Sequence, residues 1–292
     1  MSKPTTAALA AHLTASVRTM RRRYRKRLDR SQKKFSETSV HELRIETRRM
    51  LALVDLLRAL HAAGPLKKIR KVFKQRLDSF DELRDTHVQL QLLKPLWREF
   101  PEARGLALWL RRREKRLIAD LRHAIKATKQ LRVEKRLKDM EKLLRKSGRA
   151  EGPPMGKAQA AAALQAAFAG VVELHKRVRR SNTETIHRMR VAFKRFRYMS
   201  ELLQPLFPRV TAKRLRQMQA YQALMGDIQD IEVLLAGLAQ AVAKRHLAAV
   251  DAGGLRSELQ RRRRDLIDTF MAAVDKLFEF HPEKLTRRAR KN

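Results

Sequence analysis

The segment Val40-His-Glu-Leu-Arg-Ile-Glu-Thr-Arg-Arg-Met50 recurs in altered form as Ile186-His-Arg-Met-Arg-Val-Ala-Phe-Lys-Arg-Phe196, at an offset of 146 residues. Residues three and four apart are neighbours on the surface of a helix. In both copies that spacing places apolar side chains in one stripe and basic side chains in the stripe next to it. This shared arrangement indicates that the chain contains two related helical halves.

Two further segments recur in the same order. Residues 83–90 match 228–235 at an offset of 145, and residues 106–118 match 255–267 at an offset of 149. Three ordered matches with a nearly constant offset predict an internal duplication. Each half then holds about four helices, and four antiparallel helices joined by short turns are typical of a bundle.

Prolines set the bounds of the expected helices, because proline is excluded from helix interiors. The nine prolines leave long spans rich in good helix formers, and only 5% of the residues are aromatic. No strand-like alternation occurs, so we expect an all-α protein. The expected helices cover residues 5–28, 38–62, 66–94, 103–146, 157–178, 183–204, 209–245 and 255–280.

The chain divides near its midpoint. Residues 147–156 contain three glycines and two prolines, which is typical of a linker. We therefore expect a first four-helix half over residues 1–146 and a second over 157–282. Residues 283–292 are expected to form a basic tail.

The net charge points to a polyanionic partner. The 292 residues include 68 Lys and Arg against 30 Asp and Glu, which gives +38, while 43% of the residues are apolar. The apolar content argues against a disordered basic segment, so a compact fold has to hold this charge despite self-repulsion. Nucleic acid, an anionic membrane surface or an inorganic polyanion would each account for it.

Several functional classes are disfavoured. Because the chain has no cysteine, it cannot form disulfides, a cysteine metal site or a thiol nucleophile. It has no apolar stretch of about 18 residues for a bilayer span and no compact apolar signal core, so we expect a cytoplasmic protein without membrane insertion. It also lacks a phosphate-binding glycine loop and the zinc motif His-Glu-x-x-His. We expect no enzyme, no metal and no cofactor.

Each repeated helix is expected to carry a row of cations beside its apolar stripe. The rows are His41, Arg44 and Arg48, flanked by Arg49, and His187, Arg190, Lys194 and Arg197, flanked by Arg195. Like charges one helical turn apart repel each other, and desolvation beside a core raises the cost. An anionic ligand would offset that cost, since arginine donates paired hydrogen bonds to phosphate and lysine supplies a point charge. Alternatively, these are solvated surface cations, and each histidine makes a local hydrogen bond at a helix start.

These motifs resemble the CHAD family, the conserved histidine α-helical domain. The pattern His-x-x-Arg-(Val/Ile)-x-x-(Arg/Lys)-Arg occurs twice, each time followed by (Leu/Ile)-x-Asp-x-x-Val-x-Leu, and the resemblance covers about residues 8–280. It implies one domain of two four-helix bundles related by a pseudo-two-fold, with both rows facing a basic central groove or pore. It further implies binding of inorganic polyphosphate and association with polyphosphate granules.

The resemblance carries the polyphosphate-binding role to nine residues of this sequence. They are His41, Arg44, Arg48, Arg49, His187, Arg190, Lys194, Arg195 and Arg197. Leu51 departs from the family, which often has a basic residue there, so the first row is expected to contact one phosphate fewer.

Other charged residues are weaker candidates. The repeated acids Asp85 and Asp230 either orient an arginine of the rows or form ordinary salt bridges. Further cations in the third repeated segment either extend the polyphosphate site or face solvent. They are Arg112, Arg113, Lys115, Arg261, Arg262 and Arg264. Trp109 falls at helical spacing and is expected in the core.

Nonspecific nucleic-acid binding is the alternative function, and +38 predicts it at low salt. Against it, the chain has only three Tyr and two Trp for base stacking, and no helix-turn-helix spacing.

If His41 and His187 face an anion, the anion should raise their pKa values. Binding should then tighten below about pH 7.

Overall fold

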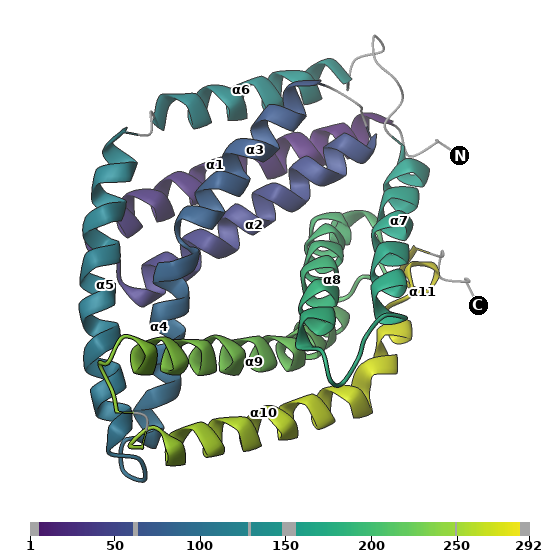
Figure 1. The fold of residues 1–292 in the computed structure, drawn as a ribbon. Coiled ribbons are helices and arrows are strands. Elements are labelled where there is room, and N and C mark those ends of the chain that lie inside the picture. Colours follow the sequence, from purple (N-terminus) through teal and green to yellow (C-terminus); the bar gives the residue numbers. More distant parts are fainter. Residues whose placement is uncertain (1–5, 61–63, 128–129, 148–155, 249, 287–292) are drawn as a thin grey trace.

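The computed structural model describes residues 6–60, 64–127, 130–147, 156–248 and 250–286. All regular structure in this part of the chain is helical, which confirms the expected all-α class (Figure 1). The elements of the first half are α1 (Thr6–Lys34), α2 (Glu37–Leu60), α3 (Gly64–Ser79), α4 (Asp81–Leu93), the 3-10 helix η1 (Lys94–Leu96), α5 (Glu102–Ala127) and α6 (Gln130–Ser147). Those of the second half are α7 (Lys157–His175), α8 (Thr183–Leu203), η2 (Gln204–Leu206), α9 (Ala212–Ala243), α10 (Gly253–Ala273), η3 (Val274–Phe280) and α11 (Pro282–Thr286).

The first connection is shorter than expected. The expected helices over residues 5–28 and 38–62 leave a longer connection, but α1 continues to Lys34 and only Phe35 and Ser36 separate it from α2. Phe35 has a positive φ of 47° and is fully buried, with its ring stacked on that of Phe80 at 6.4 Å. Burial of the aromatic ring therefore accounts for a tight turn at a residue that is not glycine.

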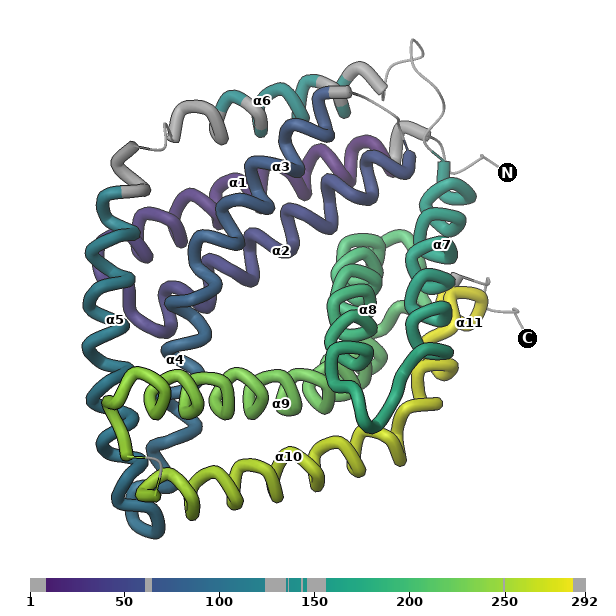
Figure 2. Tube along the Cα trace, viewed as in Figure 1, coloured from purple at the N-terminus to yellow at the C-terminus, as the bar shows by residue number. Residues whose placement is uncertain are grey.

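The expected helix over residues 66–94 is two helices, α3 and α4, which meet at Phe80 (Figure 2). Phe80 is 1% exposed, and its N–H donates to the carbonyl of Leu77 at 3.2 Å, which closes a tight turn. The corresponding helix of the second half, α9, runs unbroken for 32 residues. The two halves thus differ at the bend in their third helix.

Three other expected elements have different bounds. The helix expected over residues 103–146 is divided into α5 and α6, and residues 128–129 between them lie outside the described part. The last long helix ends at Ala273 and continues as the 3-10 helix η3. Residues 283–286 of the expected tail belong to α11, where Leu285 is fully buried. Most of the expected linker lies outside the described residues.

Two clusters of buried apolar side chains hold the protein together. The larger combines α1, α2, α3 and α6 with α7, α8, α9 and η3. The smaller packs α4 and α5 against α9 and α10, as Figure 1 shows at the lower left. Each cluster draws side chains from both halves, so apolar packing joins the halves to each other. Within the described residues, no helix has the length and apolar character that a bilayer span requires.

The two helices with the repeated motif, α2 and α8, pack against each other. Their predicted apolar stripes are buried, which confirms them. The stripe members are Val40, Leu43, Thr47, Met50, Val54 and Leu57 on α2, and Ile186, Met189, Phe193, Phe196 and Leu203 on α8. Burial of these stripes fixes the rotation of each helix, and with it the direction of the neighbouring cation row. Trp109 is also in the core, as expected.

Candidate functional site

The two cation rows come together where α2 packs on α8. Arg44 and Arg48 from α2 lie within electrostatic reach of Arg190 and Lys194 from α8. We call these four residues the inner cations. Arg44 is 4% exposed and Lys194 is 9% exposed, so this charge is largely removed from water.

Burial and mutual repulsion shift the inner cations away from their ordinary pKa values. Burial, followed by Arg48 and Arg190, holds the pKa of Lys194 well below its usual range. Burial and then Arg44 lower the pKa of Arg48 to about 10. Burial also lowers the pKa of Arg190. The fold therefore holds these charges at a cost in free energy. This agrees with the cost that the spacing of the cation rows predicts when no anion is bound.

Within the described residues, internal partners neutralise only one of the inner cations. Nη2 of Arg44 lies 2.5 Å from a carboxylate oxygen of Asp81, and its Nη1 donates to the carbonyl of Leu77 at 2.9 Å. In the described part of the chain, the side chains of Arg48, Arg190 and Lys194 form no ion pair or hydrogen bond. Buried Nε atoms of Arg44 and Arg190 also lack an acceptor among the described residues. Several donors thus remain for an external anion.

The two repeated histidines lie at the start of the rows. Partial burial, followed by Arg84 and Arg48, lowers the pKa of His41. His187 is half-buried, and its Nδ1 has no hydrogen-bond partner among the described residues. Because of this partial burial and the nearby cations, His41 becomes charged at a more acidic pH than an ordinary histidine.

The repeated acids lie beside the inner cations, on α4 and α9. Burial raises the pKa of both Asp85 and Asp230, and the charge of Asp230 raises that of Asp85 further. Arg44 acts on Asp85 and Arg190 acts on Asp230 in the opposite direction. Neither acid forms an ion pair with a described residue, so the simple salt bridge is not formed. Asp81, one helical turn before Asp85, is the carboxylate that contacts Arg44.

Besides Arg44, three more cations of the predicted set have partners. Arg49 on α2 lies 2.6 Å from Glu201 on α8, and Arg195 on α8 lies 3.0 Å from Asp55 on α2. The offset of 146 relates these two ion pairs, so each helix gives the other an arginine and a carboxylate. We call them the outer pairs. Arg197 donates to Gln222 at 2.9 Å and stacks on Tyr198.

The six weaker candidates lie on α5 and α10. Arg113 contacts Glu82 and Gln240 and comes near enough to lower the pKa of Asp85. Arg261 and Arg262 both bind Glu258. The remaining three, Arg112, Lys115 and Arg264, are exposed. Arg113 is thus the member of this group that acts on Asp85, beside the inner cations.

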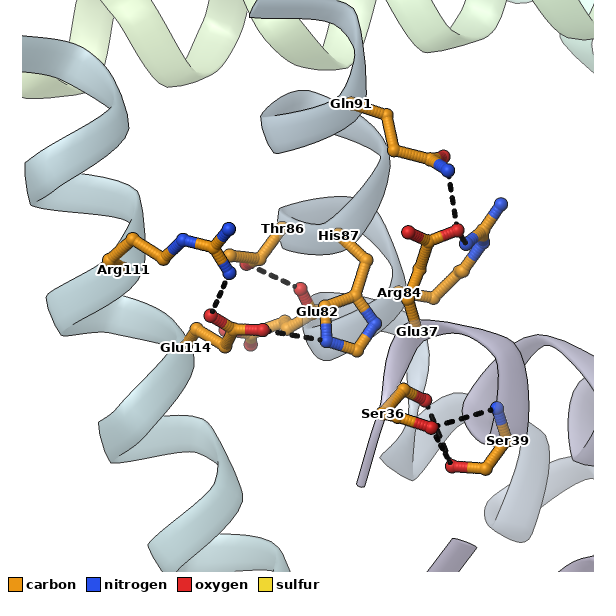
Figure 3. Close-up of polar contacts among 10 residues, drawn as sticks. All are labelled: Ser36, Glu37, Ser39, Glu82, Arg84, Thr86, His87, Gln91, Arg111 and Glu114. Atoms are coloured by element: carbon orange, nitrogen blue, oxygen red, sulfur yellow. Dashed lines mark hydrogen bonds and ion pairs between the residues drawn. The ribbon is translucent and has the colours of Figure 1, made fainter. Parts of the chain in front are cut away.

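Arg84 also lies beside the candidate site, although the repeat in the sequence gives no signal for it. Its Nη1 lies 3.5 Å from Glu37 at the start of α2 (Figure 3). It lowers the pKa of both His41 and Asp230. Arg84 lies inside a repeated segment, but its counterpart is Gln229. A search for residues shared by both halves therefore passes over it.

A buried histidine beside the site joins α4 to α5. His87 is 3% exposed, and its Nε2 lies 3.0 Å from Glu114, which also contacts Arg111 (Figure 3). Burial lowers the pKa of His87. Because its contacts run to α5, we assign His87 to helix packing. His87 is not a repeated histidine, because its counterpart in the second half is Glu232.

Comparison with solved structures identifies the fold as that of a CHAD domain. The CHAD domain from the plant Ricinus communis superposes with a TM-score of 0.72 at 18% identity, covering 94% of each chain. PptA from Streptomyces chartreusis superposes with a TM-score of 0.67 at 14% identity, covering 95% of this chain and 100% of its own. The family model of the CHAD domain matches residues 33–239. The chain belongs to the CHAD domain family, as its motifs indicated. The comparison with curated protein sequences found no match.

Proposed function

We propose that this protein binds inorganic polyphosphate through the inner cations. The observation that carries the proposal is a desolvated group of four cations in which, as far as the described residues go, only Arg44 has an internal carboxylate. Such charge is stabilised when an anion arrives. The CHAD fold and family agree with this function but do not specify the ligand.

A flexible phosphate chain suits the arrangement of the donors. Arg44 and Arg48 lie one turn apart on α2, as Arg190 and Lys194 do on α8, so donors recur at about 6 Å along each helix. The arginines can each bind a pair of phosphate oxygens, and Lys194 supplies a point charge. Affinity then comes largely from counterion release and falls steeply with salt.

The outer pairs have a structural role in this proposed function. Arg49 and Arg195 are already neutralised across the α2–α8 contact, so we assign them to holding the helices together. Arg197 is likewise engaged by Gln222. Polyphosphate that reaches them would have to break an existing contact, and we expect them to contribute less affinity than the inner cations.

Nonspecific nucleic-acid binding is the second candidate, supported by the net charge of +38. Binding of single strands would also use exposed aromatic side chains as stacking platforms. Tyr198, the aromatic residue beside the inner cations, is 5% exposed and covered by Arg197. This burial favours a phosphate chain without bases over a nucleic acid.

We expect the protein to bind polyphosphate without catalysis, in the cytoplasm and at polyphosphate granules. Purified protein should leave polyphosphate chains intact, and shortening of the chains over time would contradict this part. In cells, a fluorescent fusion should collect at granules and disperse when the inner cations are replaced.

The test compares two variants that lose the same charge. Replacing Arg44, Arg48, Arg190 and Lys194 by Ala should weaken binding of long-chain polyphosphate at least about a hundredfold at about 150 mM salt. The control replaces four cations near the C-terminus by Ala: Arg287, Arg288, Arg290 and Lys291. Equal losses in both variants would mean that the site lies elsewhere.

A competition measurement on the natural chain separates the two candidate functions. Long-chain polyphosphate, single-stranded DNA, double-stranded DNA and heparin compete for the protein at about 150 mM salt, where nonspecific binding is weakened. We expect unlabelled polyphosphate to displace labelled long-chain polyphosphate at a lower phosphate concentration than the other polyanions do. Equal displacement by all four polyanions would leave only a generic cationic surface.

A further inference from the structure

The two halves differ at one position beside the inner cations. The offset of 146 takes Arg44 to Arg190, and the offset of 145 takes Asp81 to Gly226. Arg44 meets the carboxylate of Asp81 at 2.5 Å. Arg190 instead lies against the α9 backbone, since a Cβ added at Gly226 would be 3.5 Å from its Nε and Nη2. The corresponding arginines therefore have an internal anion in one half and none at the same place in the other.

Other charged groups do not remove this difference. Asp230, Asp227 and Asp85 act on Arg190 through space, but none of them forms an ion pair with it among the described residues. Arg44 has the Leu77 carbonyl as a second partner, at the bend between α3 and α4. Both partners of Arg44 thus depend on the break at Phe80, which α9 lacks.

We propose that Asp81 is an internal competitor that restrains polyphosphate binding by occupying Arg44, an inference that rests on the proposed function. Incoming phosphates meet Arg48, Arg190 and Lys194 with their donors available. A phosphate that binds Arg44 has to displace the Asp81 carboxylate first. The Asp81 side chain is 46% exposed, so it can turn into solvent when it is displaced.

The first test removes the charge of Asp81 and keeps its shape. Asp81→Asn should tighten binding of long-chain polyphosphate about three- to tenfold and steepen the dependence on salt by about one released ion. Asp78→Asn is the matched control: it changes the net charge equally and lies three residues away, at the end of α3, where Asp78 pairs with the exposed Lys74. We expect the control to stay within about twofold of the natural chain.

Coupling to Arg44 distinguishes competition from a general charge effect. In an Arg44→Ala background, Asp81→Asn should no longer tighten binding, because the group that it releases is absent. Unchanged or weaker binding by Asp81→Asn, or the same gain without Arg44, would overturn the inference.

The second test adds a competitor to the other half, so it does not depend on how Asp81→Asn folds. Gly226→Asp should weaken polyphosphate binding about three- to tenfold relative to Gly226→Ala, which measures the effect of side-chain bulk alone. This difference should vanish when Arg190 is Ala. Equal binding by the Asp and Ala variants would contradict the inference.

Failure of the inference can be told apart from failure of the proposed function. If Arg48→Ala and Lys194→Ala weaken binding while neither carboxylate variant behaves as expected, the site stands and the role of Asp81 is rejected. If Arg48→Ala and Lys194→Ala leave polyphosphate binding unchanged, the proposed function fails and the inference fails with it.

Discussion

The inner cations and the outer pairs are adjacent on the same two helices, yet their charges have different surroundings. Arg48 and Arg49 are consecutive residues, as are Lys194 and Arg195. Arg49 and Arg195 each meet a carboxylate of the opposite helix, whereas Arg48 and Lys194 have no such partner in the described part. We infer that one side of the α2–α8 contact stabilises the fold, and the other holds charge for a ligand at the expense of stability.

Reversing one inner charge should have the largest effect on polyphosphate binding. Lys194→Glu places a carboxylate among three arginines, so it should weaken polyphosphate binding about a hundredfold. The same substitution should raise the free energy of unfolding without ligand, because repulsion is replaced by attraction. Binding titration and thermal unfolding measure the two effects. A variant that binds polyphosphate as tightly as the natural chain would show that Lys194 is not in the site.

Removing an acid of the outer pairs should have the opposite pattern. The Asp55 side chain is 6% exposed and lies near three arginines, at 2.8 Å from Arg70, 3.0 Å from Arg195 and 3.9 Å from Arg58. Asp55→Ala should lower the free energy of unfolding by about 1–2 kcal/mol, because the charge-assisted hydrogen bonds to these partly exposed arginines are lost. Polyphosphate affinity, measured where the variant is folded, should stay within about threefold. A loss of affinity comparable to that of Lys194→Glu would remove the distinction between the two sets.

A neutral replacement sharpens the comparison by separating charge from volume. Lys194→Met keeps an unbranched chain and removes the buried ammonium, so the free energy of unfolding should rise by about 1 kcal/mol. Affinity for polyphosphate should fall about tenfold, because one of the four inner charges is lost. Chemical denaturation measures the first quantity. Lower stability in this variant would mean that the lysine is better accommodated than its surroundings indicate.

The smallest expected effect is a dependence of affinity on pH. The pKa of His41 is lowered, and the pKa values of Asp85 and Asp230 are raised, so acidification adds a proton at each position beside the ligand. A bound polyanion favours the protonated forms, and affinity should therefore rise a few-fold between about pH 7.5 and 5.5. His41→Gln should flatten the histidine part of this rise. Equal affinity throughout the interval would remove both the histidine and the acids from the site.

Features shared by both halves could be predicted from the sequence. Helical spacing identified the apolar stripes, and the repeat of that spacing identified Arg44, Arg48, Arg190 and Lys194 as one set. Features of one half only could not be found in this way. Asp81 and Arg84 escaped because their counterparts are Gly226 and Gln229, and a comparison of halves ignores residues that differ.

The bend at Phe80 and the division of the core also escaped prediction, for a physical reason. Residues 66–94 contain no proline or glycine, so no local signal separates α3 from α4. The break depends on the burial of Phe80 against Phe35, a contact between segments that are distant in sequence. Likewise, apolar spacing shows that a helix has a partner but does not show that α4 and α5 find theirs on α9 and α10.

The cores shared between the halves also set the order in which the protein becomes complete during synthesis. When the ribosome has released α1 to α6, Arg44 and Arg48 have been made, but Arg190 and Lys194 have not. At that stage the apolar faces of α4 and α5 that later pack on α9 and α10 still lack their partners. The inner cations are therefore brought together only after α8 has left the ribosome, and a chain that ends before α8 carries only Arg44 and Arg48 of the four, on an unfinished fold.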